Sequence, residues 1–188
     1  QKLEVGQFYI PGFIDIHCHA PQFPNRGLGT DIDLLQWLQC YTFPEEKKYA
    51  DVGYARERYG RVVRESLGNG TTCCVYFATV HKEATKCLME VCHEMKQRAY
   101  VGKVCMHINS PEDYKDESVE QCMADNQEIY EHSATLPNVH SVVTPRFAPV
   151  CSVEMMRALG EFAKQRNLLI QSHISESRGE IACMADLF

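Results

Sequence analysis

The sequence predicts an α/β fold: an incomplete (β/α)8 barrel of about the first five β/α units. Three observations predict it. Apolar, β-branched segments alternate with segments of helical spacing. Polar residues follow the expected strands, at the end where barrel enzymes carry their active sites. No glycine-rich phosphate loop follows the first strand, as it more often does in the competing fold, a doubly wound sheet. The 188 residues are fewer than the roughly 250 of a typical barrel.

The first expected strand, residues 13–16, follows a Pro-Gly pair and leads into two histidines. Because side chains alternate in a strand, His17 and His19 point the same way and Cys18 points the opposite way. Two imidazoles on one face, at the end of a buried strand, are suitable zinc ligands. The alternative is a pair of unrelated histidines on a half-exposed strand.

Two helices are expected between this strand and the next. A loop rich in Pro and Gly spans residues 20–30, and Asp31 then caps a helix that ends at 42–44. The second helix covers about residues 54–67, and a Gly-Asn-Gly sequence stops it.

From residue 71 onward, strands and helices alternate regularly. The strand segments are rich in β-branched and aromatic residues, and the helical segments have an apolar face. Ser152 caps one helix, and Glu154 supports its first turn. The expected strands are 71–77, 99–106, 139–143 and 168–172. The expected helices are 82–97, 118–132 and 152–167, and a further helix begins before the end of the sequence.

Polar residues at the strand ends supply the rest of the candidate chemistry. His173 follows the fifth strand, so we expect it at the same mouth as His17 and His19. Glu176, just beyond it, can take a proton from an activated water and return it to a leaving group. Alternatively, Glu176 opens the next helix and favours the helix dipole. His81 follows the second strand, and we interpret it as structural.

Gln22 and Arg146 are candidate substrate-binding residues. Gln22 lies on the loop over the site, where an amide both donates and accepts hydrogen bonds. Arg146 ends the fourth strand and presents a planar fork to a carbonyl oxygen or a ring nitrogen. The alternatives are a solvated loop residue and a structural ion pair. Trp37, Phe43 and Phe147 are expected in the core or the pocket wall, where a ring can stack on a flat base.

Composition limits the classes of partner. The chain is 45% hydrophobic, which suffices for one core, and it carries a net charge of −6 without a Lys/Arg cluster. This charge argues against nucleic acid or an anionic membrane as a partner. No apolar run approaches the roughly 20 residues of a membrane span. The ten cysteines include no Cys-x-x-Cys pair, which favours reduced thiols and a cytoplasmic location over a disulfide scaffold.

Several motifs resemble those of a known enzyme family. Pro-Gly-Phe-Ile-Asp-Ile-His-Cys-His at 11–19 resembles the opening metal motif of the amidohydrolase superfamily, which comprises metal-dependent hydrolases on a (β/α)8 barrel. Further segments, in family order along nearly the whole chain, resemble the guanine deaminase family within it. They are HCHAPQ at 17–22, LLQWL at 34–38, YTFP at 41–44, NGTT at 69–72, YFAT at 76–79, VGKVCM at 101–106, TPRF at 144–147 and QSHISE at 171–176.

This resemblance implies hydrolytic deamination of guanine to xanthine and ammonia in purine catabolism, with one Zn²⁺ per subunit. Matched positions imply that His17, His19 and His173 are the zinc ligands. Glu176 matches the catalytic proton shuttle, which protonates a ring nitrogen as the activated water attacks C2. The resemblance also implies a homodimer. The implied substrate-binding residues are His19, Gln22, Arg146, Phe147, His173 and Glu176.

The family carries a further metal-binding His and a metal-binding Asp beyond the last residue of this sequence. We therefore expect residues 1–10 to be the remnant of a removed N-terminal β segment and residues 11–188 the N-terminal part of the barrel, as a fragment of a complete enzyme. The alternatives are a non-catalytic truncated isoform that binds the full-length subunit, or a deaminase of another amino-substituted heterocycle. Because an open sheet exposes its edges and inner face, we expect the isolated chain to fold poorly, aggregate or bind zinc weakly.

Overall fold

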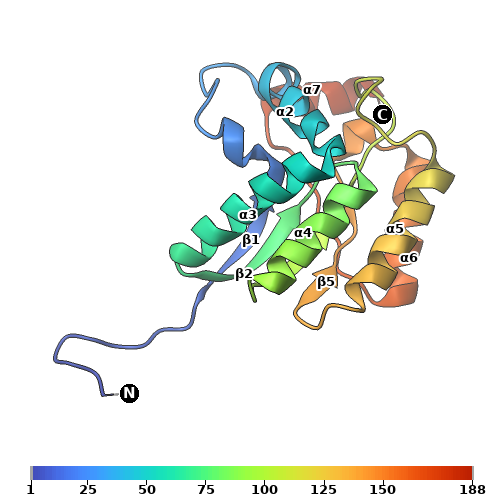
Figure 1. Cartoon of the computed structure of the whole chain (residues 1–188). Helices are drawn as coiled ribbons and strands as arrows, with labels where there is room; N and C mark the ends of the chain where they lie inside the picture. Colours follow the sequence, from blue (N-terminus) through green and yellow to red (C-terminus); the bar gives the residue numbers. More distant parts are fainter. Residues whose placement is uncertain (1, 188) are drawn as a thin grey trace.

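Parallel strands that follow one another in chain order build the sheet (Figure 1). The structure, a computed structural model, describes residues 2–187, so the predicted domain limits at Gln1 and Phe188 lie outside the described residues. A two-stranded sheet pairs β4 (Val104–Cys105) with β6 (Thr144–Pro145). The main sheet, in the order β1-β2-β3-β5, consists of β1 (Phe13–His19), β2 (Thr71–Phe77), β3 (Arg98–Gly102) and β5 (Val139–Ser141).

The strand order decides between the two candidate folds. Every pair of neighbouring strands is parallel, and β1, β2, β3 and β5 lie side by side in chain order, whereas a doubly wound sheet reverses its order at a switch point. Isolated parallel bridges join Val143 to Ile170 and Phe147 to His173, and they continue the series. The prediction of an incomplete barrel of about five β/α units is confirmed.

The predicted strand at 168–172 is wrong in its extent. Within this segment Ile170 forms an isolated bridge to Val143, and the next bridge, from His173 to Phe147, lies just beyond it, so there is no continuous ladder. Leu169 and Ile170 are 60% and 55% exposed, so the segment lacks the packing that would hold a regular strand. The segment nevertheless brings His173 beside Arg146, whose carbonyl oxygen accepts a hydrogen bond from the His173 backbone N–H at 3.2 Å.

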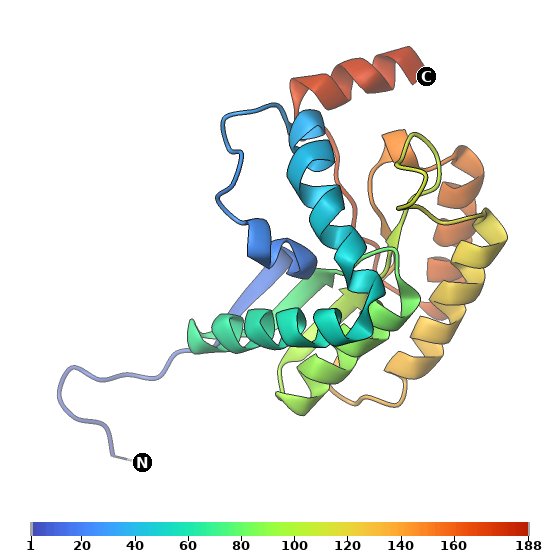
Figure 2. The same cartoon turned by 45° about the horizontal axis from the view of Figure 1, so that its top comes forward.

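Successive helices pack side by side over the sheet, and Figures 1 and 2 show α3, α4 and α5 in this arrangement. Ser152 caps α6 as predicted, because its hydroxyl oxygen accepts from the Met155 N–H at 3.1 Å. The helix predicted over 82–97 ends earlier, because Lys96 adopts a left-handed conformation with φ 59°. The helices are α3 (Val52–Gly68), α4 (Lys82–Glu94), α5 (Val119–Ser133), α6 (Val153–Arg166) and α7 (Arg178–Leu187).

The first predicted helix differs most from expectation. Its cap is Asp33 rather than Asp31, and the Asp33 carboxylate accepts from the Leu35 N–H at 3.0 Å. The helix also continues past 42–44, because Pro44 falls in the first turn of α2, where a helix tolerates proline. The predicted loop at 20–30 contains the short helix η1 (Ala20–Asn25). The continuous run consists of α1 (Leu34–Trp37), η2 (Leu38–Thr42), α2 (Phe43–Glu46) and η3 (Lys47–Ala50).

The predicted strand over 99–106 is interrupted between Gly102 and Val104. A Cβ atom on Gly102 would lie 1.8 Å from the Thr144 side chain and 2.4 Å from the Val142 carbonyl oxygen, so only glycine permits this approach of the backbones. The strand over 139–143 is divided in the same way into β5 and β6. The interruption turns the Lys103 side chain into the interior.

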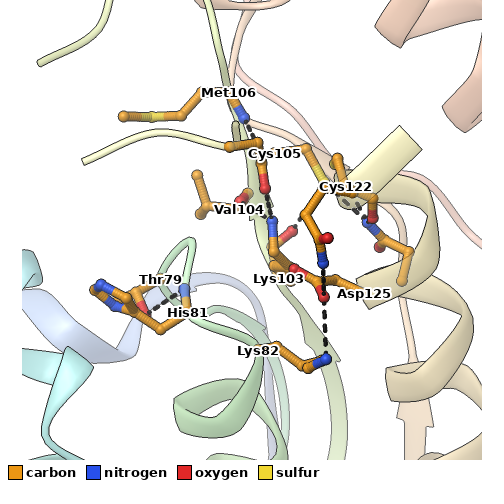
Figure 3. A network of polar contacts seen from close by, with 12 residues as sticks. Thr79, His81, Lys82, Lys103, Val104, Cys105, Met106, Cys122 and Asp125 are labelled. Carbon is orange, nitrogen blue, oxygen red and sulfur yellow. Dashed lines mark hydrogen bonds and ion pairs between the residues drawn. The ribbon is translucent and has the colours of Figure 1, made fainter. Parts of the chain in front are cut away.

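Lys103 is the centre of a buried polar network, drawn in Figure 3. Its ammonium group contacts the Asp116 carboxylate and donates to the Val104 carbonyl oxygen at 3.4 Å. Asp116 also accepts from the Met106 N–H at 3.0 Å. Burial lowers the pKa of Lys103, but the charge and hydrogen bond of Asp116, together with the neighbouring thiols of Cys122 and Cys105, hold that pKa above its usual value. The network therefore joins β4 to the loop that precedes α5.

All ten cysteines are free, as expected of reduced thiols, and several of them, including Cys87, Cys92, Cys105 and Cys122, are buried like small apolar residues. Cys18 packs against the core beneath α3 and α4, as expected from its alternation with His17 and His19. Large apolar side chains are exposed along β1, including Ile14 and Ile16. No helix in the described part of the chain is long and apolar enough to cross a membrane.

Candidate functional site

Three imidazoles meet at the carboxyl end of the sheet. His17 and His19 extend from the end of β1, and His173 arrives from the segment bridged to Phe147. The ring centroids of His17 and His19 are each 4.9 Å from that of His173, and their candidate ligand nitrogens lie within 4.8 Å of one another. Strand alternation and the shared end of the barrel thus bring the three predicted histidines together.

The hydrogen bonds and protonation of these rings suit a metal ion. His173 Nδ1 lies 2.6 Å from the Arg146 carbonyl oxygen, so this nitrogen carries the proton and Nε2 keeps its lone pair. His173 Nε2 lies 2.8 Å from His19 Nε2, so with its own proton on Nδ1 it accepts a hydrogen bond from His19 Nε2–H. Burial, and then the Arg146 charge, hold the pKa of His19 well below its usual value. Burial also lowers the pKa of His173. Neutral imidazoles of this kind are metal ligands.

Phe77 holds the three rings in place. Its ring stacks on His19 at 4.4 Å between centroids and 20° between planes, and it lies 4.9 Å from His17 and 4.6 Å from His173. Phe77 is fully buried at the end of β2, where it pairs with His19 in the sheet register. Phe77 was not predicted as a site residue, although its position at a strand end was a signal.

A cavity of about 190 Å³ opens over the histidines, and its walls include every residue that the sequence singled out for the site. Trp37, predicted in the core or pocket wall, lies in the wall. Phe147 is 5% exposed and is another part of the wall. Leu34 and Leu38 complete the apolar side. The predicted site residues in the lining are His17, His19, Gln22, Arg146, Phe147, His173 and Glu176.

Arg146 forms an ion pair and also faces the cavity. Its Nη1 and Nη2 atoms donate to the two carboxylate oxygens of Glu46, at 2.7 Å and 3.3 Å. Burial lowers the pKa of Arg146, but the charge and hydrogen bonds of Glu46, together with Tyr114 and Glu176, raise it overall. Gln22 is not a solvated loop residue, because its amide nitrogen donates to Glu46 at 3.0 Å. Glu46 was not predicted as part of the site.

A second acidic residue that the sequence analysis missed, Glu180, shapes the loop that carries Glu176. The Glu180 carboxylate accepts from the Ser175 N–H at 3.1 Å and from the Glu176 N–H at 2.6 Å. Ser175 adopts a left-handed conformation with φ 54°. Glu180 lies in the first turn of α7 and is 3% exposed. This helix begins at Arg178, so Glu176 precedes the helix and does not open it. The Glu176 side chain lines the cavity.

His81 lies apart from this cavity. Its Nδ1 is 3.0 Å from the Thr79 hydroxyl, its ring centroid is 5.7 Å from that of Tyr114, and it lines a separate polar hollow with Lys82 and Asp125. Burial, and then the Lys103 charge, lower the pKa of His81. The arrangement agrees with the structural interpretation of this residue.

Comparisons with known proteins agree with this geometry. Residues 8–188 match the amidohydrolase family. A guanine deaminase from Dictyostelium discoideum is 47% identical over 185 residues, which are 97% of this chain and 41% of that protein. The human guanine deaminase is 40% identical over 190 residues, 100% of this chain and 42% of that protein. The chain thus spans about two fifths of the length of these relatives.

Solved structures give the same result for the fold. A crystal structure of guanine deaminase from C. acetobutylicum, with guanine bound in its active site, superposes with a TM-score of 0.91 at 41% identity. The match covers 95% of this chain and 42% of that one. An adenosine deaminase from Xanthomonas campestris with bound zinc shares the fold, with a TM-score of 0.75 at 21% identity. Amidohydrolases are generally metal-dependent. On the family match and the shared fold, this chain belongs to the amidohydrolase family.

Proposed function

We propose that this protein, at its native length, is a guanine deaminase that converts guanine and water to xanthine and ammonia. The observation that carries the proposal is the match, at 41% identity over 95% of the chain, to a guanine deaminase with bound guanine. A cavity that combines three imidazoles with an amide, a guanidinium and a carboxylate supports it. The alternative heterocycle deaminases have weaker support, because triazine hydrolases match at only 14–17% identity.

We propose that His17, His19 and His173 hold one zinc ion per subunit. Zinc, when bound, makes a water molecule nucleophilic at neutral pH. The hydrogen bond from His173 Nδ1 to the Arg146 carbonyl orients the ring so that Nε2 faces His19. Phe77 limits the freedom of all three rings by packing against them.

The remaining site residues would bind the purine and move protons. Gln22 and Arg146 hydrogen-bond its polar edge, and Phe147 packs beside it in the wall of the cavity. The Glu176 carboxylate accepts a proton from the attacking water and passes it to the ring nitrogen next to C2. This protonation offsets the loss of aromaticity as the C2–O bond forms. The proton of the new C2 hydroxyl then moves to the C2 amine, the C2–N bond breaks to release ammonia, and the C2=O bond of xanthine forms.

Assembly, location and domain limits remain proposals of the same kind. We propose a cytoplasmic homodimer with a small-molecule purine as substrate, and the net charge of −6 disfavours a nucleic-acid partner. Residues 11–188 would form the N-terminal part of the barrel, and residues 1–10 the remnant of a preceding β segment. The exposed apolar side chains of β1 support a continuation of the sheet beyond this strand.

The test is turnover by the zinc-loaded, native-length protein with guanine, adenine and cytosine as competing substrates, followed by ultraviolet absorbance and ammonia release. We expect guanine to be preferred, and Glu176→Gln to lower kcat by about 10²–10⁴-fold with unchanged zinc content. Glu161→Gln, on the exposed face of α6, is the matched control and should leave kcat unchanged. Preference for adenine or cytosine would refute the substrate assignment.

A further inference from the structure

Glu46, at the end of α2, is the residue on which the polar side of the cavity converges. It is fully buried, and each of its carboxylate oxygens accepts two hydrogen bonds. Oε1 accepts from Gln22 Nε2 at 3.0 Å and from Arg146 Nη2 at 3.3 Å. Oε2 accepts from Arg146 Nη1 at 2.7 Å and from the Tyr114 hydroxyl at 2.7 Å. One buried carboxylate thus holds both residues that are proposed to bind the purine.

The chemistry of a carboxylate determines which atom of Gln22 remains for a ligand. An ionised carboxylate only accepts hydrogen bonds, so the Gln22 amide must turn its NH₂ group toward Glu46. Its oxygen, Oε1, is then the atom left to accept from a molecule in the cavity. Without Glu46, the amide could rotate by a half turn at little cost and present a donor instead.

Arg146 is constrained in the same way, because a guanidinium group only donates. Two of its donors are engaged by Glu46, and the bidentate contact fixes the plane of the group. The Phe43 ring lies 5.0 Å from the guanidinium carbon and limits its movement on another side. The donors that remain lie beside the Gln22 amide, since both groups contact the same Glu46 oxygen and both line the cavity.

We propose that Glu46 is a positioning residue that makes the cavity present one acceptor, Gln22 Oε1, beside the donors of Arg146. This pattern is complementary to a lactam edge, in which an N–H lies next to a C=O. A 6-oxopurine has such an edge. A 6-aminopurine has the reverse, an acceptor nitrogen next to an amino donor, and leaves buried polar groups of the site unpaired. The inference rests on the proposed function and identifies what selects the substrate.

The test compares guanine with 2,6-diaminopurine in the zinc-loaded, native-length protein. Both molecules carry the reacting 2-amino group, and they differ at the edge that Gln22 and Arg146 are proposed to bind. We expect Glu46→Gln to raise KM for guanine by about ten- to a hundredfold and to lower the ratio of kcat/KM for guanine over diaminopurine. Glu46→Asp, which keeps the charge, should restore part of the ratio, and zinc content should stay unchanged.

Glu45→Gln is the matched control. Glu45 is the adjacent residue and is 8% exposed, but it bonds Lys48 and Tyr54 and touches neither Gln22 nor Arg146. Its variant should keep the ratio of the unmodified protein. If Glu46→Gln does not fold, Tyr114→Phe removes one hydrogen bond from Glu46 and should shift the ratio in the same direction.

The outcomes separate this inference from the proposed function. An unmodified protein that does not deaminate guanine refutes the proposed function, and the inference with it. An unmodified protein that prefers guanine, with a ratio unaltered in folded Glu46→Gln or, failing that, in Tyr114→Phe, refutes the role of Glu46 alone. A purely structural role would lower the amount of folded protein without changing this ratio.

Discussion

At the scale of single residues, Lys103 and Asp116 form a buried ion pair. Their side chains are 0% and 3% exposed. Withdrawal of two charges from water costs several kcal/mol per ion, and mutual attraction compensates for this cost only while both partners are present. The backbone N–H of Met106 also bonds Asp116, so β4 depends on the same pair.

We expect Lys103→Met to lower the free energy of unfolding by about 3–5 kcal/mol, because Asp116 stays buried without a counter-charge. Asp116→Asn should cost a similar amount, and the double variant clearly less than the sum. Urea unfolding of the native-length protein measures all three. Arg61→Met, which breaks an exposed pair with Glu57, is the control and should cost at most about 1 kcal/mol. If the two single losses in free energy of unfolding simply add in the double variant, the coupling between Lys103 and Asp116 is contradicted.

The residues of the site differ in how far the sequence reveals them. His17 and His19 were predictable because strand alternation is a local rule, and His173 because parallel strands share one mouth. Glu46 was not, since its contacts span 24 residues to Gln22 and 100 residues to Arg146. No local pattern distinguishes it from the adjacent Glu45, and their different partners are a consequence of tertiary packing.

At the scale of helices and strands, both ends of α6 were predicted, whereas the cap of the first helix was not. Ser152 and Asn167 bound α6 as expected, because the cap bonds join residues close in sequence. The division between β3 and β4 was missed, because it depends on Thr144 packing against Gly102 from a distant segment. The length of the run from α1 to η3 was missed because Pro44 was interpreted as a stop, although proline is also accepted in a first helical turn.

The end of α6 allows a direct test of backbone conformation. Asn167 has φ 53° and ψ 44°, a left-handed conformation that asparagine and glycine tolerate and alanine does not. The side chain is exposed, so its replacement removes little packing. We expect Asn167→Ala to lower the free energy of unfolding by about 1 kcal/mol, and Asn167→Gly to change it less. Equal unfolding midpoints in urea for the two variants would contradict this account.

At the scale of the whole molecule, the alternation of strands and helices was enough to predict the barrel, because right-handed parallel crossovers leave few other arrangements. This alternation does not predict which residues cover the two edges of the sheet. On β1, Phe13, Ile14 and Ile16 are 58–75% exposed, and at the other end Leu169 and Ile174 are 60% and 87% exposed. These side chains lie where a closed barrel would bury them.

We expect the 188-residue chain, when expressed alone, to self-associate at micromolar concentration, because β1 offers unpaired backbone groups and apolar side chains. Light scattering should detect the association. A variant with Ile14→Lys and Ile16→Lys should scatter less, whereas Leu28→Lys, an exposed apolar position away from the sheet, should not help. If the unmodified chain is monodisperse, the exposed edges of its sheet do not cause self-association, and the prediction is wrong.

Arg146 takes part in the site twice, through different atoms. Its side chain faces Glu46 and the cavity, whereas its carbonyl oxygen accepts the hydrogen bond that orients His173. A carbonyl is present whatever amino acid occupies the position. If Arg146 binds the purine as proposed, mutation at codon 146 alters which heterocycle is recognised while the hydrogen bond that orients this histidine persists. Under that proposal, substrate range can diverge during evolution without the loss of hydrolytic chemistry at each intermediate step.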